Sequence, residues 1–173
     1  MRTKMQRWVL QGVVMGCLLS MGLVAPANAV GATQISGVGV YDDAAGSECG
    51  PGPAPFDDTP GLILTGSLEG CLFTDVLTET DHGTPSGIYL QTGRELIVAS
   101  MNGGPVERFT TTYKFESKWS PDVSTGVEVK GRCQHPIVKG SGTGSFAGAT
   151  GRLDFKDEVS TGLFFYRGHI KLG

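Results

Sequence analysis

The sequence lacks any segment in which apolar residues recur with the period of a surface helix. Such a stripe is the main sequence signal of an amphipathic helix, so its absence favours an all-β chain. What recurs after Gly61 is a series of short segments that alternate polar and apolar residues, separated by turn residues. This pattern is typical of half-buried strands.

Nucleotide-binding motifs are also missing, although the chain holds 27 glycines. Gly142, Gly144 and Gly148 give G-x-G-x-x-x-G, which is not the dinucleotide spacing, and no Gly-Lys-Ser/Thr follows them. The next segment alternates like a strand, whereas a phosphate site needs a helix N-terminus there. We therefore expect no nucleotide site and no cofactor.

The sequence contains no recognisable hydrolase or metal motif. There is no nucleophile elbow and no Cys/His/Asn context for a triad. Of the three histidines, only His135 has a nearby cysteine, in Cys133-x-His135, while the acids around Asp42 and Asp57 lack the spacing of a calcium loop. We expect no metal ion.

The N-terminus has the layout of a signal peptide over residues 1–29. Arg2, Lys4 and Arg7 precede an apolar run from Trp8 to Val24, and Ala27-Asn28-Ala29 is a small-x-small cleavage site. We predict cleavage near Ala29, one β-barrel domain over residues 30–173, and a location outside the cell, in the periplasm or in the cell envelope. Two alternatives remain open, an uncleaved anchor and lipidation at Cys17.

Basic residues are scarce relative to acids, with 14 Lys and Arg against 17 Asp and Glu. Removal of a leader with three bases and no acid would lower the net charge from −3 to −6. Nucleic acids and anionic membranes bind to basic patches, and we expect no such patch on this acidic chain. We expect no nucleic-acid partner and membrane contact only through the signal peptide during export; the oligomeric state stays open.

Three cysteines follow the leader, an odd number for an oxidising compartment. We expect one disulfide and one free thiol among Cys49, Cys71 and Cys133. Cys49–Cys71 would close a loop of about twenty residues, and Cys71–Cys133 is a second possibility that spacing does not exclude. The remaining thiol is expected to be buried and inert.

The alternation and turn residues predict eight or nine strands. Residues 42–61 carry Pro51, Pro53, Pro55 and Pro60, so we read them as a long surface loop, either pinned over one barrel end or without fixed structure. The expected strands are 33–41, 62–68, 71–80, 87–91, 94–100, 109–119, 127–138, 152–159 and 163–172, with hairpin turns at Glu69-Gly70 and Thr92-Gly93.

A glycine-dense run, Gly140 to Phe155, reads GSGTGSFAGATGRLDF and turns directly into a strand pattern. Its GTGSFAGATG resembles the corner of the allene oxide cyclase barrel and dirigent-like superfamily. With GRCQHPI, HGTPSG and FFYRGHI, it is similar to a branch of small secreted bacterial proteins in that superfamily. The resemblance covers about residues 62–172 and implies a single eight-stranded antiparallel barrel of the lipocalin type. No catalytic residue of the plant cyclases maps onto this chain.

Side-chain parity predicts what faces the barrel interior. Tyr113 and Phe115 share one face of their strand, and Val127, Val129, Gly131 and Cys133 share a parity whose next member is His135. His82 and His169 are expected on the surface. The candidate acid/base residues are therefore His135 and Tyr113, although a satisfied core histidine is the plainer interpretation. The predicted ligand-lining residues are Phe109, Tyr113, Phe115, Cys133, His135, Phe155 and Tyr166.

Three functions fit this pattern. The first is an exported barrel that binds a small apolar ligand in its interior. The second is an enzyme of the isomerase or cyclase kind, which the resemblance implies, with His135 or Tyr113 moving a proton. The third is a barrel filled with side chains, which would have a structural or surface-interaction role. A cavity bordered by His135 and Tyr113 would favour the first two.

Overall fold

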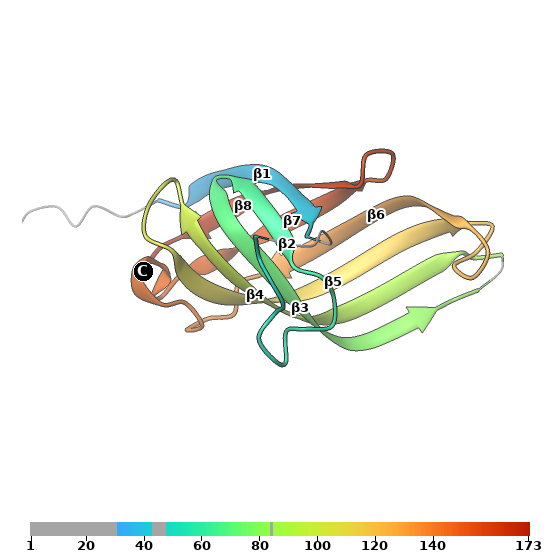
Figure 1. Cartoon of the computed structure of the whole chain (residues 1–173), viewed down its shortest axis with the longest axis horizontal. Coiled ribbons are helices and arrows are strands. Elements are labelled where there is room, and N and C mark those ends of the chain that lie inside the picture. The colour runs from blue at the N-terminus through green and yellow to red at the C-terminus, as the bar shows by residue number, and fades with distance from the viewer. Residues whose placement is uncertain (1–30, 43–47, 84) are drawn as a thin grey trace, which may run out of the picture.

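The computed structural model describes residues 31–42, 48–83 and 85–173, and the predicted signal peptide lies outside them. In this part of the chain eight antiparallel strands close into one barrel, in which each strand pairs with the next and β8 pairs with β1 (Figure 1). The predicted all-β, eight-stranded antiparallel barrel is confirmed. The strands are β1 (Thr33–Tyr41), β2 (Leu62–Gly66), β3 (Leu68–Asp81), β4 (Ile88–Met101), β5 (Glu107–Ser120), β6 (Val127–Pro136), β7 (Thr150–Glu158) and β8 (Leu163–Lys171). No helix in the described ranges has the length and apolar character to cross a membrane.

Strand parity separates the barrel interior from the outer surface, as expected. On β5 Phe109 and Tyr113 are buried while Lys114 is exposed, so their side chains point to opposite faces of the sheet. His82 and His169 are exposed and His135 is buried, as predicted. Burial of the inner aromatic and aliphatic side chains is the main favourable term that holds such a barrel together.

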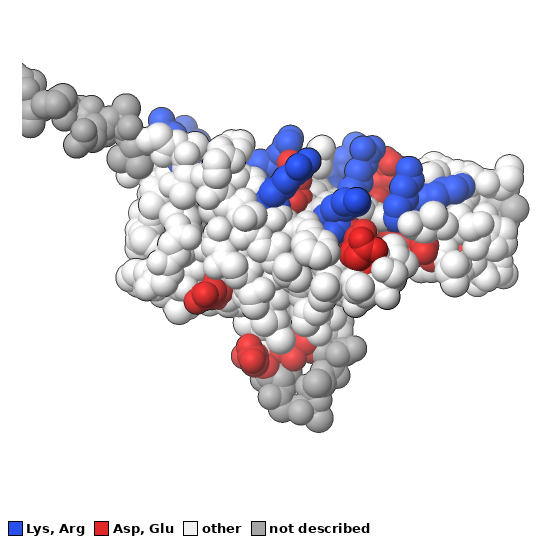
Figure 2. Space-filling model, turned by 90° about the horizontal axis from the view of Figure 1, so that it is seen from above, with Lys and Arg blue, Asp and Glu red and all other residues white. Residues whose placement is uncertain are grey.

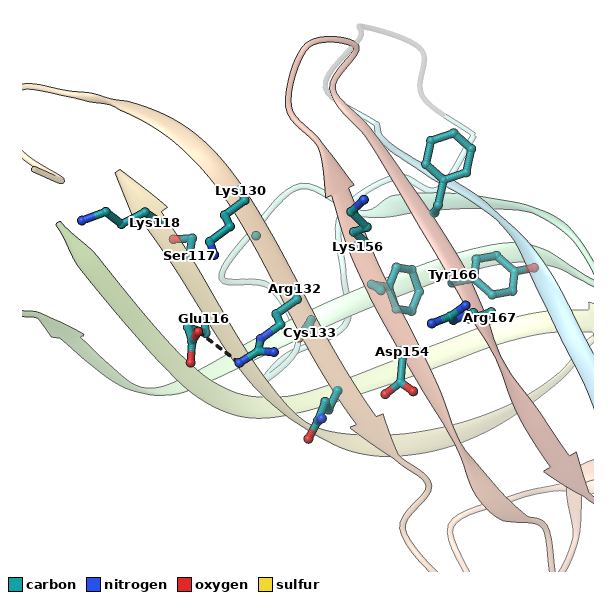
Figure 3. Close-up of a pocket in the computed structure, with 14 residues that line it drawn as sticks. Glu116, Ser117, Lys118, Lys130, Arg132, Cys133, Asp154, Lys156, Tyr166 and Arg167 are labelled. Atoms are coloured by element: carbon teal, nitrogen blue, oxygen red, sulfur yellow. Dashed lines mark hydrogen bonds and ion pairs between the residues drawn. The ribbon is translucent and has the colours of Figure 1, made fainter. Parts of the chain in front are cut away.

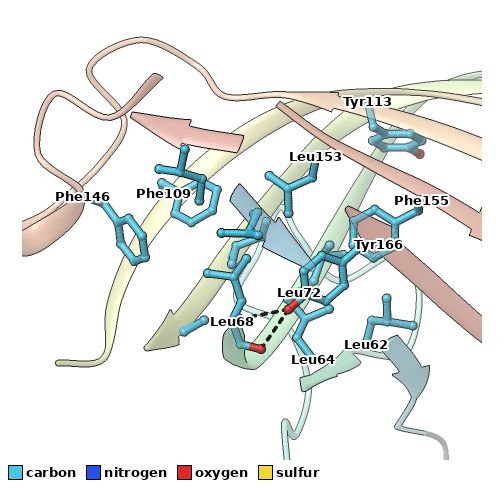
Figure 4. Close-up of a cluster of buried hydrophobic side chains, with 14 of the residues drawn as sticks. Leu62, Leu64, Leu68, Leu72, Phe109, Tyr113, Phe146, Leu153, Phe155 and Tyr166 are labelled. Atoms are coloured by element: carbon cyan, nitrogen blue, oxygen red, sulfur yellow. Dashed lines mark hydrogen bonds between the residues drawn. The ribbon is translucent and has the colours of Figure 1, made fainter. Parts of the chain in front are cut away.

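The glycine-dense run closes one end of the barrel. It contains a short 3-10 helix, η1 (Gly144–Phe146), which places the Phe146 ring 4.7 Å from the ring of Phe109 inside the barrel (Figure 4). Both rings are fully buried. Gly144 has φ +48°, and a Cβ there would lie 2.0 Å from Oε1 of Glu107. Glycine is favoured at this corner because the left-handed backbone conformation strains any residue that has a Cβ, and a side chain would also have to displace that carboxylate.

Two predicted hairpin turns are wrong, because the glycines that suggested them lie within long strands. Thr92-Gly93 lies within β4, where a Cβ on Gly93 would meet the backbone oxygen of Asp75 at 2.1 Å. Gly70 lies within β3 and packs against the backbone of Val98, so the turn between β2 and β3 falls at Ser67 instead. Both glycines allow close backbone approach across the sheet, which is the second common role of glycine in a strand.

The inward placement of Val127 and Val129 is also wrong. Both side chains are exposed, while Gly131 on the same strand is buried. The register between β5 and β6 shifts between Lys118 and Trp119, so one extra residue of β6 is unpaired there. A β-bulge reverses the parity of the residues beyond it, and parity counted from Val127 therefore fails at this point.

The long loop after β1 is pinned to the outside of the barrel in its described part, residues 48–61. Cys49 forms a disulfide with Cys71 on β3, which decides the pairing that spacing left open, and Cys133 is free and buried. Asp58 accepts a hydrogen bond from the backbone of Val76 at 2.6 Å and donates its own amide to the backbone of β3. These contacts hold the end of the loop, Thr59 and Pro60, beside the barrel opening.

Candidate functional site

A cavity of about 100 Å³ lies inside the barrel on the side of Tyr113 and Phe155, away from the Phe146 end (Figure 4). It is bordered by His135 and Tyr113, as the first two function hypotheses require. The wall is mostly apolar or aromatic, with a few polar groups, which is the composition usual for a ligand site. The lining residues are Tyr41, Thr59, Pro60, Leu62, Leu72, Thr74, Gln91, Glu95, Tyr113, Phe115, Cys133, His135, Phe155, Asp157 and Phe164.

The polar centre of this cavity is a buried pair of side chains, Glu95 and His135. Nδ1 of His135 donates a hydrogen bond to Oε2 of Glu95, and both side chains are at least nine-tenths buried. The hydroxyl of Thr111 donates to the same carboxylate oxygen at 3.0 Å. Thr111 can do so because it lies directly opposite Glu95 in the pairing of β4 with β5. A carboxylate that holds Nδ1–H fixes the orientation and tautomer of an imidazole.

The other nitrogen of the same ring has no partner. Nε2 of His135 is buried and makes no hydrogen bond among the described residues. The ring itself is held on two sides, by Tyr113 in a stacked arrangement and by Phe155 at 4.6 Å between centroids. An unsatisfied buried polar atom carries a desolvation cost of about 1–3 kcal/mol. A ligand or water in the adjoining cavity would remove that cost.

Tyr113 keeps its proton in this environment. Burial, together with the nearby charge of Glu95, raises the pKa of the phenol well above its usual value. Its hydroxyl donates a hydrogen bond to Oε1 of Gln91 at 2.9 Å. Tyr113 can therefore orient a bound group or donate a hydrogen bond, and it is a poor base at neutral pH.

The free thiol of Cys133 lines the cavity and is chemically quiet. Burial raises the pKa of this thiol strongly, and the carboxylate of Glu95 adds to the effect. Because the thiolate is the reactive form, a thiol with a raised pKa contributes packing rather than nucleophilic chemistry. This agrees with the expectation of an inert third cysteine.

Two further carboxyl groups meet at the edge of the cavity. Asp157 and Glu128 both lie over Gly131, where a Cβ would be 2.0 Å from the aspartate and 2.5 Å from the glutamate oxygen. Desolvation, the charge of Asp157 and a hydrogen bond with it raise the pKa of Glu128 to about 7. Burial also raises the pKa of Asp157. The pair therefore shares a proton, carried by Glu128, at mildly acidic pH.

This carboxyl pair makes stability depend on pH. The folded-state pKa of Glu128 lies above the unfolded value, so its protonation favours the folded state below pH 7, and stability falls as pH rises from about 4.5 to 7. We expect Glu128→Gln to remove most of this dependence and to stabilise the protein at pH 8 by about 1 kcal/mol after solvent screening. Urea unfolding at pH 5 and pH 8 measures it. Equal pH dependence in the two proteins would contradict the shared proton.

The structure brings together five of the seven residues predicted to line a ligand site. Tyr113, Phe115, Cys133, His135 and Phe155 border the cavity. The other two predicted residues do not border it. Phe109 packs against Phe146 at the closed end, and the hydroxyl of Tyr166 accepts a hydrogen bond from the backbone amide of Leu68 at 2.9 Å.

Sequence reasoning missed Glu95, the residue that orients the histidine. The predicted strand 94–100 already places Glu95 in phase with Ile97 and Ala99, both fully buried, but the acid was not counted among the lumen residues. An acid in phase with buried apolar residues was the available signal, because a buried carboxylate requires a partner.

No protein-family model matches the chain, and neither a curated protein nor a solved structure matches it.

Proposed function

We propose that this protein binds a small, largely apolar ligand inside the barrel through one hydrogen bond to His135. The observation that carries this proposal is the buried Nε2 of His135, which lacks a partner among the described residues beside a cavity. Glu95, which accepts a hydrogen bond from Thr111, fixes the ring from the other side, so the hydrogen-bonding position is set before a ligand arrives. Pre-organisation of this kind lowers the entropic cost of binding.

The dimensions of the cavity limit the ligand. Its volume of about 100 Å³ is below the roughly 300–1,000 Å³ of pockets for drug-sized molecules. A single ring with one polar substituent, or the end of a longer apolar chain, matches this space. With Nδ1 donating to Glu95, a neutral ring presents an acceptor at Nε2, which favours a ligand with an O–H group.

The test uses phenol as the probe and benzene as the matched control. We expect phenol to shift the imidazole nitrogen resonances of His135 in NMR spectra and to leave those of the exposed His82 and His169 unchanged. Benzene should bind at least tenfold more weakly, because it leaves Nε2 unpaired. His135→Phe should reduce the preference for phenol over benzene to less than threefold. Equal affinity for the two probes, or shifts at all three histidines, would contradict the proposal.

A second candidate function is proton transfer by an isomerase or cyclase. The hydrogen bond between Glu95 and His135 favours it, because a carboxylate that holds one imidazole nitrogen leaves the other free to act as a general base. The resemblance to the allene oxide cyclase barrel and dirigent-like superfamily points the same way. This function predicts that His135→Ala abolishes turnover and retains ligand affinity, whereas the binding function predicts loss of the phenol preference alone.

Export is part of the proposal. The disulfide between Cys49 and Cys71 supports it, since structural disulfides persist mainly in oxidising compartments. The closed eight-stranded barrel supports the fold that the family resemblance implies, and membership of that family remains part of the proposal. Mass spectrometry of the exported protein would measure the site of leader cleavage and any retained ligand together.

A further inference from the structure

Charge is distributed very unevenly along this chain. Arg94 is the only lysine or arginine between residues 31 and 106, whereas residues 107–173 contain ten of the 14 in the sequence. The second region forms β5 to β8, which are neighbours in the barrel. The fold therefore gathers basic side chains on one side of a protein whose net charge is negative, as Figure 2 shows. The expectation that the protein has no basic patch is therefore wrong, because the fold brings together charges that are dispersed along the sequence.

Like charges face each other directly on the outer surface of these strands. Lys118 lies opposite Lys130 in the pairing of β5 with β6, and Arg132 lies opposite Lys156 in the pairing of β6 with β7. Cross-strand pairs of the same charge destabilise a sheet. Two such pairs on adjacent strand pairings lower the stability of the sheet through charge repulsion. A bound anion would turn this repulsion into attraction, because each cation would then interact with the anion.

These residues line a groove rather than a flat surface. The groove has a volume of about 700 Å³ and opens where the pairing of β6 with β7 ends, at Arg132 and Lys156 (Figure 3). Arg132 forms an ion pair with Glu116 at 3.2 Å. Lys130 and Lys156 form no ion pair with any residue in the described ranges, so their charges are available to a ligand.

One exposed aromatic ring borders the same groove. Phe165 lies directly opposite Lys156 in the pairing of β7 with β8, and its side chain is 47% exposed. A single exposed apolar side chain is ordinary on a protein surface, so this ring is relevant for its position beside a lysine and not for its exposure. A ring lying beside a cation offers a ligand both an apolar face and a charge contact.

We propose that this groove binds an acidic polysaccharide. The anionic groups of the polymer contact Lys130, Arg132 and Lys156, and the apolar face of a sugar ring lies on Phe165. The concave shape of the groove fits a polymer chain better than the flat surface of a bilayer. Non-specific single-stranded nucleic-acid sites stack successive bases on several aromatic side chains, and Phe165 is the single exposed aromatic of the groove lining. Cys133 and Phe155 border both the groove and the lumen cavity, but Lys130, Arg132, Lys156 and Phe165 border only the groove, so the proposal rests on other observations than the proposed function.

The experiment titrates the full mature chain with a fluorescent heparin oligosaccharide over a series of NaCl concentrations. Neutral dextran of equal length and single-stranded DNA of equal charge are the comparison probes. We expect Lys130→Gln/Lys156→Gln to raise the Kd for heparin at least tenfold and to reduce the slope of log K against log salt by about 2. The control Lys139→Gln/Lys171→Gln removes the same charge outside the groove and should change Kd less than threefold.

A third variant tests the ring contact. Phe165→Ala is expected to raise the Kd several-fold and to leave the salt slope unchanged, because it removes no charge. Dextran should not bind. The proposal is overturned if heparin does not bind, if the two double variants behave alike, or if DNA binds as tightly as heparin. The melting temperature of the charge variants is measured alongside to exclude loss of fold, and removal of like-charge pairs should leave it equal or higher.

Discussion

Glu95→Ala is expected to lower the free energy of unfolding by about 3–5 kcal/mol. The variant leaves two buried donors, Nδ1–H of His135 and the hydroxyl of Thr111, without the carboxylate oxygen that both now share. Breaking a buried pair by removing one partner costs this much because the remaining polar groups stay desolvated. Urea unfolding at pH 7 measures the loss as a lower midpoint with an unchanged m-value.

Two variants make this measurement specific. Glu95→Gln retains a side-chain oxygen that can accept from both donors, so we expect it to recover more than half of the loss. Glu79→Ala removes an exposed carboxylate that accepts from Tyr89 and Gln91, and should cost less than about 1 kcal/mol. A loss in the free energy of unfolding below about 1 kcal/mol for Glu95→Ala would show that the hydrogen bond between Glu95 and His135 does not stabilise the barrel. The phenol preference should weaken in Glu95→Ala, since His135 loses the acceptor that fixes its orientation, and should be largely retained in Glu95→Gln.

Phe109→Ala is expected to cost about 3–5 kcal/mol, because it removes a fully buried ring and leaves a void against Phe146. The matched control is Phe165→Ala, which truncates the same side chain on the outer face of β8, where it is 47% exposed. We expect the control to cost less than about 1 kcal/mol. Both values come from urea unfolding under identical conditions.

The position of Phe109 also tests whether the packed core at the closed end of the barrel is separate from the cavity beside His135. Phe109 lies at the closed end and does not border the cavity. Once correction is made for the unfolded fraction, phenol affinity should therefore be unchanged in Phe109→Ala. Similar destabilisation by the two phenylalanine variants would contradict the packing of η1 against β5. A large loss of phenol affinity in the folded fraction would contradict the separation of the core from the cavity.

The elements predicted best were those whose signal is local. The limits of β1 matched the alternation of residues 33–41, and the inward placement of Tyr113 and His135 followed from counting every second residue. The same counting failed at Val127 and Val129, because the register shift in β6 depends on how that strand pairs with β5. The glycine signals at Gly70 and Gly93 were misread for a similar reason. Each glycine accommodates a neighbouring strand that its own segment does not reveal.

Within strands that carry no bulge, the sequence by itself determined which side chains face the lumen and which face water, because the period-two alternation of a strand is a property of consecutive residues. Only the tertiary structure decided which of those side chains meet. Glu95 and His135 are 40 positions apart in the sequence and form a hydrogen bond in the fold. Cys49 forms its disulfide with Cys71 and not with Cys133. The basic groove combines charges from β5, β6 and β7. Strand register and barrel closure create these contacts, and both depend on the packing of all eight strands at once.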